Sequence, residues 1–170
     1  FQPYSYPVWH PNGQLLGFNH TPLTGIVANG NSPCIWYSYL ANPDSTGFYI
    51  VKKDGTGLKR ITDYNIYDPA WSPDGNWLIF MQNAQIYKMH FTGIGFDTAN
   101  VIQLTNNGAN FFPSWTANND TIYYDSNVGT PVGTSYYSIW KMASDGNAKR
   151  QVSTQGTYGR QPFVAGNKLI

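Results

Sequence analysis

The stretch YDPAWSPDGNWLIF, residues 67–80, decides the fold of this chain. It joins a Pro-x-Trp to a Pro-Asp-Gly and closes on an apolar run. Pro presets φ at about −65°, Asp bonds back to the backbone and Gly accepts a positive φ, so Pro-Asp-Gly is typical of a tight turn. The stretch therefore predicts a short strand, a hairpin turn and a second strand. We expect Asp74 to shape the turn and Trp71 to pack against a neighbouring part of the fold.

The same pattern recurs along the sequence. It appears upstream as YPVWHPNGQLLGF and downstream as FPSWTANNDTIYY and QPFVAGNKLI. The steps from Trp9 to Trp71, to Trp115 and to Phe163 are 62, 44 and 48 residues. A repeat of roughly 40–50 residues that carries four short strands is the signature of a propeller blade. The Pro before each aromatic residue has no N–H, so we expect it at a strand end or a bulge.

The second halves of the repeats also align, as GFYIVKKDGTGLKRIT, QIYKMHFTGIGFDTANVIQLT and SIWKMASDGNAKRQVST. Each contains an apolar-aromatic pair, then Lys, a Gly-containing turn and a short segment that closes on Thr or Ser-Thr. We therefore expect an all-β chain with blade 1 at about 4–62, blade 2 at about 66–105, blade 3 at about 109–154 and the start of a fourth blade at 158–170.

The run PAWSPDGNWLIF, followed by IYKM and QLT, resembles the repeat of TolB-like β-propellers. The likeness is close at 69–80, degenerate at 113–124, and covers nearly the whole chain outside one insert. It implies blades of four antiparallel strands, a periplasmic or secreted location, and docking of other proteins on an end face or in the channel. Some TolB-like propellers belong to oligogalacturonate lyases, and similar ones gate prolyl oligopeptidase-type peptidases. The resemblance is specific for the fold and leaves the function open.

Three full repeats and the start of a fourth cannot close a ring, because propellers use about 4–8 blades. An open ring would leave strand edges and a blade face exposed. We therefore expect this chain to be part of a longer protein whose further blades complete the ring. The alternative is that another chain completes it.

The composition of the chain argues against nucleic acid and the membrane interior as partners. Charged residues make up 11% of the chain and the net charge is +1, so no basic surface is expected to hold nucleic acid. No stretch approaches the roughly 18–20 apolar residues that cross a bilayer, so membrane insertion is not expected. Cys34 is the only cysteine, which rules out a disulfide within these residues.

An insert at residues 20–47 separates two strands of blade 1 that blade 2 joins by a short turn. Its segment CIWYSYL predicts an extended strand in a projecting hairpin. Trp36, Tyr37 and Tyr39 are candidate contacts for a partner or ligand, because loops on a rigid scaffold often carry function. The alternative is that they cap the propeller or pack on another part of the protein.

The first strand of each blade lines the central channel of a propeller. These strands place Tyr67, Asp68 and Arg160 at the channel as candidate binding residues. Aromatic rings with a few polar groups suit a peptide, a sugar or a protein terminus. An equally good explanation is that these side chains only fill the tapered centre of the propeller.

The sequence offers no catalytic motif. His10, His20 and His90 lack metal-ligand spacing, and no Gly-x-Ser-x-Gly is present, so we predict no cofactor, no metal and no catalytic residue. His10 stands where the repeat has Ser, and is expected at the surface or as a cap. These observations favour a binding or scaffold propeller with a protein partner. The alternatives are the propeller part of an enzyme and a carbohydrate-binding propeller.

Overall fold

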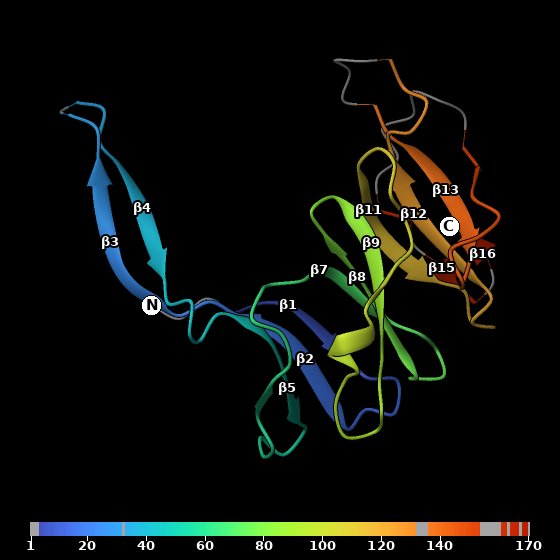
Figure 1. The fold of residues 1–170 in the computed structure, drawn as a ribbon, viewed down its shortest axis with the longest axis horizontal. Helices are drawn as coiled ribbons and strands as arrows, with labels where there is room; N and C mark the ends of the chain where they lie inside the picture. Colours follow the sequence, from blue (N-terminus) through green and yellow to red (C-terminus); the bar gives the residue numbers. More distant parts are fainter. Residues whose placement is uncertain are drawn as a thin grey trace.

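The computed structural model describes residues 4–31, 33–131, 136–153, 161–162, 164–166 and 168–169. Over these residues the chain forms three four-stranded antiparallel sheets and two two-stranded sheets. The three larger sheets are the blades of a β-propeller, and they follow one another in chain order without closing a ring (Figure 1). Within the described residues, no helix is long and apolar enough to cross a bilayer.

The strand bounds are as follows. Blade 1 contains β1 (Tyr4–Trp9), β2 (Leu15–His20), β5 (Gly47–Lys52) and β6 (Lys59–Arg60). Blade 2 contains β7 (Tyr67–Trp71), β8 (Trp77–Gln82), β9 (Gln85–His90) and β10 (Ile102–Gln103), with the 3-10 turn η1 (Thr98–Asn100) before β10. Blade 3 contains β11 (Asn110–Trp115), β12 (Thr121–Ser126), β13 (Ser138–Ala143) and β14 (Arg150–Gln151). The two-stranded sheets are β3 (Leu23–Asn29) with β4 (Trp36–Ala41), and β15 (Val164–Ala165) with β16 (Lys168–Leu169).

The first strand of each blade carries a bulge at its proline. The pairing register shifts between Ser5 and Val8 in β1, and the same shift occurs in β7 and β11. In each case the residue before the proline has a positive φ: 53° at Tyr6, 48° at Asp68 and 51° at Phe112. Because proline has no N–H, the bulge removes it from the hydrogen-bond ladder. The sequence-based expectation of a bulge is confirmed.

The Pro-Asp-Gly turn is organised by Asp74. Its Oδ1 accepts hydrogen bonds from Ser72 Oγ at 2.6 Å and from Asn76 N at 3.0 Å. Its Oδ2 accepts one from Asn76 Nδ2 at 2.9 Å, and Gly75 takes a φ of +75°. Burial alone would raise the pKa of Asp74, but the bonds from Ser72 and Asn76 outweigh it and lower the pKa. Asp74 is therefore a turn former, as its position predicts.

The repeated tryptophan packs between blades. Trp71 is 8% exposed and lies in one apolar cluster with Phe48 and Ile50 of blade 1. Trp115 is 7% exposed and lies in a second cluster with residues of blade 2. Trp9 holds the same place in blade 1 but is 54% exposed, since no described blade precedes it. Each interior tryptophan thus joins its blade to the one before, which confirms the role expected of Trp71.

Polar side chains also connect neighbouring blades. Asn19 of blade 1 is buried, and it accepts a hydrogen bond from Ile66 N at 3.1 Å while donating to Ile66 O at 2.5 Å. Lys88 of blade 2 donates to Ser144 O of blade 3 at 2.7 Å, and its ammonium lies 4.5 Å from the centre of the Trp77 ring. Burial lowers the pKa of Lys88, and the charge of Asp145 partly offsets this.

His10 does not lie at the surface as expected; it is buried between blades 1 and 2. Its ring meets the Trp71 ring edge-on, with centroids 4.5 Å apart. The Asn12 N–H donates to Nδ1, so the ring proton lies on Nε2, which donates to Gly75 O at 3.1 Å. The expectation of a surface position is wrong, because the contacts that bury His10 come from blade 2 and the His10 turn itself carries no sign of them.

The two equivalent turn glycines give a matched pair of stability tests. Gly13→Ala places a Cβ at a φ of +67° with nothing within 4 Å, so we expect a loss of about 1–2 kcal/mol in unfolding free energy. Gly75→Ala places a Cβ 2.5 Å from the His10 ring. We expect this overpacking to add roughly 1–3 kcal/mol to the loss in unfolding free energy. Urea unfolding measures both. Equal losses in the two variants would contradict the close packing of His10 on Gly75.

Candidate functional site

The insert of blade 1 forms the hairpin β3–β4, which extends away from the blades (Figure 1). The hairpin connects β2 to β5. It lies at the end of blade 1 opposite the β1–β2 turn. The two strands pack on each other, and neither packs substantially on another described strand. The hairpin predicted from CIWYSYL is therefore present as a projecting ribbon.

The hairpin is uncharged and exposed. Residues 21–43 contain no Asp, Glu, Lys or Arg. All of β4 is exposed, and Trp36, Tyr37 and Tyr39 are 60%, 61% and 62% exposed. In the described structure these three candidate residues therefore do not pack on the propeller, and their rings face solvent.

The pairing register sorts the side chains onto two faces. Ile26 lies opposite Tyr39 and Ala28 opposite Tyr37, so these pairs share one face of the ribbon. The other face carries the pair of Asn29 and Trp36 and the pair of Val27 and Ser38. Asn29 Nδ2 donates to Ser38 Oγ at 2.7 Å, and the Trp36 ring lies over Gly30, where an added Cβ would come within 2.6 Å of it. Both faces thus present an aromatic side chain.

A two-stranded ribbon is only marginally stable in water by itself. The β3–β4 hairpin has no third strand and no apolar layer from the described blades on either face. Contiguous exposed apolar surface on a folded protein usually marks an interaction site. The hairpin therefore has the geometry of a surface that becomes more stable when it is covered.

Tyr67 and Asp68 lie on β7, away from the hairpin, among the first strands of the blades. The Tyr67 ring meets the Tyr6 ring edge-on at 5.6 Å, and Asp68 Oδ2 accepts a hydrogen bond from Phe112 N at 3.4 Å. Burial raises the pKa of Asp68, and the bond from Phe112 partly offsets this. The pKa of Tyr6 is also raised, mainly by burial and to a smaller extent by the charge of Asp68.

The hydrogen bond to Asp68 comes from Phe112, which is not among the binding residues predicted from the sequence. Phe112 holds the same bulge position in blade 3 as Asp68 does in blade 2, and its positive φ accompanies the contact. The sequence signal that could have identified Phe112 is its position directly before a proline that recurs in the repeats. Arg160, the third channel candidate, lies outside the described residues.

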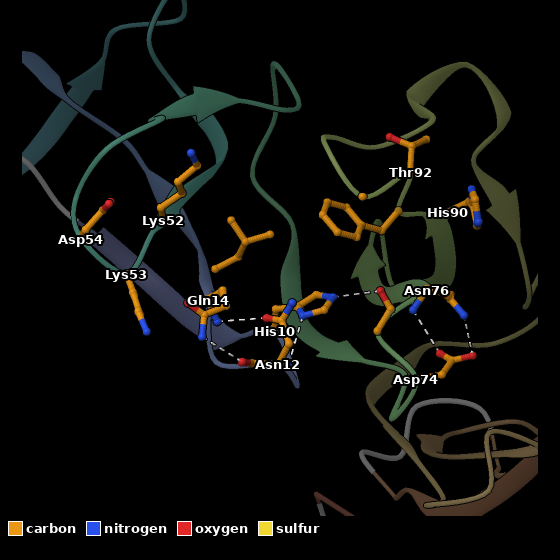
Figure 2. A pocket seen from close by; sticks show the side chains of 14 residues that line it. His10, Asn12, Gln14, Lys52, Lys53, Asp54, Asp74, Asn76, His90 and Thr92 are labelled. Atoms are coloured by element: carbon orange, nitrogen blue, oxygen red, sulfur yellow. Dashed lines mark hydrogen bonds between the residues drawn. The ribbon is translucent and has the colours of Figure 1, made fainter.

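His10 and His90 both line a pocket between blades 1 and 2 (Figure 2), whereas His20 lies at the opposite end of β2. His20 stacks on Tyr4 with ring centroids 4.6 Å apart, whereas His90 meets the edge of Trp77 at 5.0 Å. Among the described residues, no three His, Cys, Asp or Glu side chains lie together in a way that could hold a metal ion.

Comparisons with known proteins bear on the fold alone. No family model and no curated protein matches the sequence. A solved structure described as TolB from Agrobacterium tumefaciens is 14% identical with a TM-score of 0.50, over 88% of this chain and 80% of that one. A puromycin-hydrolysing peptidase from Mycobacterium tuberculosis is 12% identical with a TM-score of 0.61, over 90% of this chain and 24% of that one. An oligogalacturonate lyase in complex with manganese is 13% identical with a TM-score of 0.56, over 91% of this chain and 37% of that one.

These likenesses show a β-propeller fold similar to that of the TolB structure. The chain spans most of the TolB structure but only about a quarter of the peptidase and just over a third of the lyase. At this level of identity the activity of a neighbour does not transfer to the chain.

The substitution Asp68→Asn tests the environment of the channel-side carboxyl group. Because burial raises the pKa of Asp68 above its unfolded value of 3.8, its contribution to stability is full below that value and falls as pH rises through the folded pKa. The Asn variant keeps an oxygen for Phe112 N and does not ionise. We therefore expect its stability relative to wild type to increase from pH 4 to pH 7, as measured by urea unfolding. A difference that stays constant over this range would contradict the buried setting of Asp68.

Proposed function

We propose that this chain is a binding propeller that docks another protein through its β3–β4 hairpin and catalyses no reaction of its own. The observation that carries the proposal is the uncharged aromatic ribbon held away from the blades. A rigid scaffold that presents a projecting loop is a common arrangement for recognition. Trp and Tyr are the side chains that most often dominate the energetics of protein interfaces.

The chemistry of the hairpin indicates what its partner presents. Because residues 21–43 carry no charge, a charged partner surface would lose its hydration without gaining an ion pair. An uncharged groove lined by apolar groups matches both faces of the ribbon. The hydroxyl groups of Tyr37 and Tyr39 can remain hydrogen-bonded at the rim while their rings are buried. The partner we propose is therefore a protein with an apolar groove.

We also propose that a further blade, from the same protein or from another chain, covers the outer face of blade 1. Trp9 occupies the position at which Trp71 and Trp115 are buried by a preceding blade. Its 54% exposure leaves a large apolar ring uncovered. A blade that packed there would repeat the contact that joins blades 1 and 2.

The low charge and the likeness to TolB support an extracytoplasmic location, periplasmic or secreted. The main alternative function is the propeller part of an enzyme, because two of the similar structures are a peptidase and a lyase of which this chain matches only a part. A carbohydrate ligand stacked on Trp36 and Tyr37 is a further alternative, since exposed aromatic rings also suit sugar faces.

The triple substitution Trp36→Ala, Tyr37→Ala and Tyr39→Ala tests docking through the hairpin. Once a partner has been purified from the source cells with the wild-type chain, we expect the variant to bind it at least about a hundredfold more weakly, the loss typical of several interface anchors. The melting temperature should change little, because these side chains do not pack on the blades.

A matched control is the pair Leu58→Ala and Ile94→Ala, which removes exposed apolar side chains from loops of blades 1 and 2. Partner affinity should be unchanged in this control. Partner binding that survives the triple substitution would overturn docking through the hairpin. Lyase or peptidase activity in the purified protein would favour the enzyme alternative, whereas binding of oligosaccharides that is lost in the triple variant would favour the carbohydrate alternative.

A further inference from the structure

The β3–β4 hairpin stands away from the blades (Figure 1), so its direction is set at its base. The base consists of residues 21–22, which lead from β2 into β3, and residues 42–46, which lead from β4 back to β5. Asn42 N donates to Pro22 O at 2.7 Å, which joins these two segments to each other. That bond does not attach them to blade 1, so the orientation of the hairpin depends on further contacts.

Arg60, on β6 of blade 1, binds the returning segment of the base. Its Nη1 donates to Asp44 O at 2.7 Å, while its Nη2 donates to Pro43 O at 3.0 Å and also to Thr46 O. Hydrogen bonds from a charged donor are stronger than those between neutral groups. The guanidinium is also planar and rigid, so it fixes the three carbonyl groups relative to β6 at the same time.

The remaining bonds between the base and its surroundings come from neutral donors. Tyr49 Oη, on β5, donates to Ser45 O at 2.8 Å. Asn65 Nδ2 donates to Thr21 Oγ1 of the outgoing segment at 2.8 Å. Each of these residues supplies one bond, whereas Arg60 supplies three. Arg60 is therefore the side chain that contributes most to holding the hairpin on blade 1.

The repeat shows what the same position does where no hairpin is attached. Arg60, Gln103 and Gln151 each pair with the third residue of the preceding strand, in blades 1, 2 and 3 respectively. In all three blades the side chain donates to the backbone carbonyl two residues further on: Arg60 Nε to Thr62 O at 3.1 Å, Gln103 Nε2 to Thr105 O at 2.7 Å and Gln151 Nε2 to Ser153 O at 2.7 Å. The common role of this position is therefore a local bond that glutamine can make.

Arginine adds to that common role. The glutamine amide has a single nitrogen, and in blades 2 and 3 this nitrogen makes the local bond. Arg60 makes the local bond with Nε and has two further nitrogens, which carry the bonds to residues 43–46. Among the described blades, blade 1 alone has a two-stranded hairpin between its second and third strands, and blade 1 alone has arginine at this position.

We propose that Arg60 is a positioning residue that fixes the direction of the β3–β4 hairpin relative to blade 1. The exposed aromatic side chains of the hairpin are then presented in one orientation. This inference goes beyond the proposed docking function, because it concerns the geometry of the chain itself and holds whether or not a partner binds.

The test measures the direction of the hairpin through Cys34. This residue is exposed, lies between β3 and β4, and is the only cysteine of the chain, so a nitroxide label can be attached there. A second label is placed by Ile102→Cys on β10 of blade 2, where the side chain is also exposed. Pulsed dipolar electron paramagnetic resonance gives the distribution of distances between the two labels. We expect Arg60→Gln to broaden this distribution at least about twofold, because a hairpin released at its base samples more directions.

The Gln variant should keep its urea midpoint, because glutamine makes the local bond in the other two blades. The matched control is Lys59→Gln, which removes one positive charge from the same strand and should leave the distribution unchanged. A distribution as narrow in the Arg60→Gln protein as in the reference, or equal broadening by Lys59→Gln, would overturn the proposal. If the Gln variant does not fold, Arg60→Lys decides the question: its single nitrogen cannot reach all of these carbonyl groups, so we expect broadening there as well.

The consequence for binding rests on the docking function proposed above. We expect Arg60→Gln to bind the purified partner roughly three- to tenfold more weakly, because the hairpin must then be ordered on binding. A broadened distance distribution together with unchanged partner affinity would support the role of Arg60 and contradict docking through the hairpin.

Discussion

The structure depends on the packing of one aromatic ring between successive blades. Trp71 fills the space between blades 1 and 2, and Trp115 does the same between blades 2 and 3. A ring of this size buries enough apolar area to hold two sheets together, provided that its strand stays in position. The proline bulge two residues earlier and the Asp74 turn just after it hold Trp71 there from both sides. Each tryptophan lies within a larger apolar cluster that other buried side chains of both neighbouring blades complete.

Packing of this kind leaves the β2–β5 connection without a part in joining the blades. The β2–β5 connection can therefore extend into the uncharged hairpin. The turns at the other end of blade 1 line a pocket between blades 1 and 2, whose lining includes His10, Leu15, Asn76 and Phe91. The two surfaces differ in chemistry. The hairpin offers aromatic rings and no charge, which suits an apolar protein groove, whereas the pocket is lined by amides and by equal numbers of Lys and Asp side chains.

His10 shows how a repeat position can acquire a new role. Blade 2 has Ser72 at this place, and its hydroxyl donates to Asp74 within the same turn. The imidazole of His10 is longer, so it reaches past its own turn and meets Trp71 and Gly75 of the next blade. The same contact closes one side of the pocket between blades 1 and 2. A different residue at one repeat position thus gives a different contact between blades, while the turn keeps the same form.

Much of the fold follows from the sequence, because its signals act over a few residues. The Pro-Asp-Gly of residues 73–75 encodes its own turn, the proline before each Trp encodes a bulge, and their recurrence predicts blades. The residue types at Trp36 and Trp71, by contrast, are the same, and only the tertiary structure shows one exposed on a ribbon and the other buried between sheets. The burial of His10, the bond of Asp68 to Phe112 and the pocket formed by four distant turns were likewise decided by the tertiary structure. The physical reason is that a turn is stabilised by its own atoms, whereas burial depends on residues that only folding brings close.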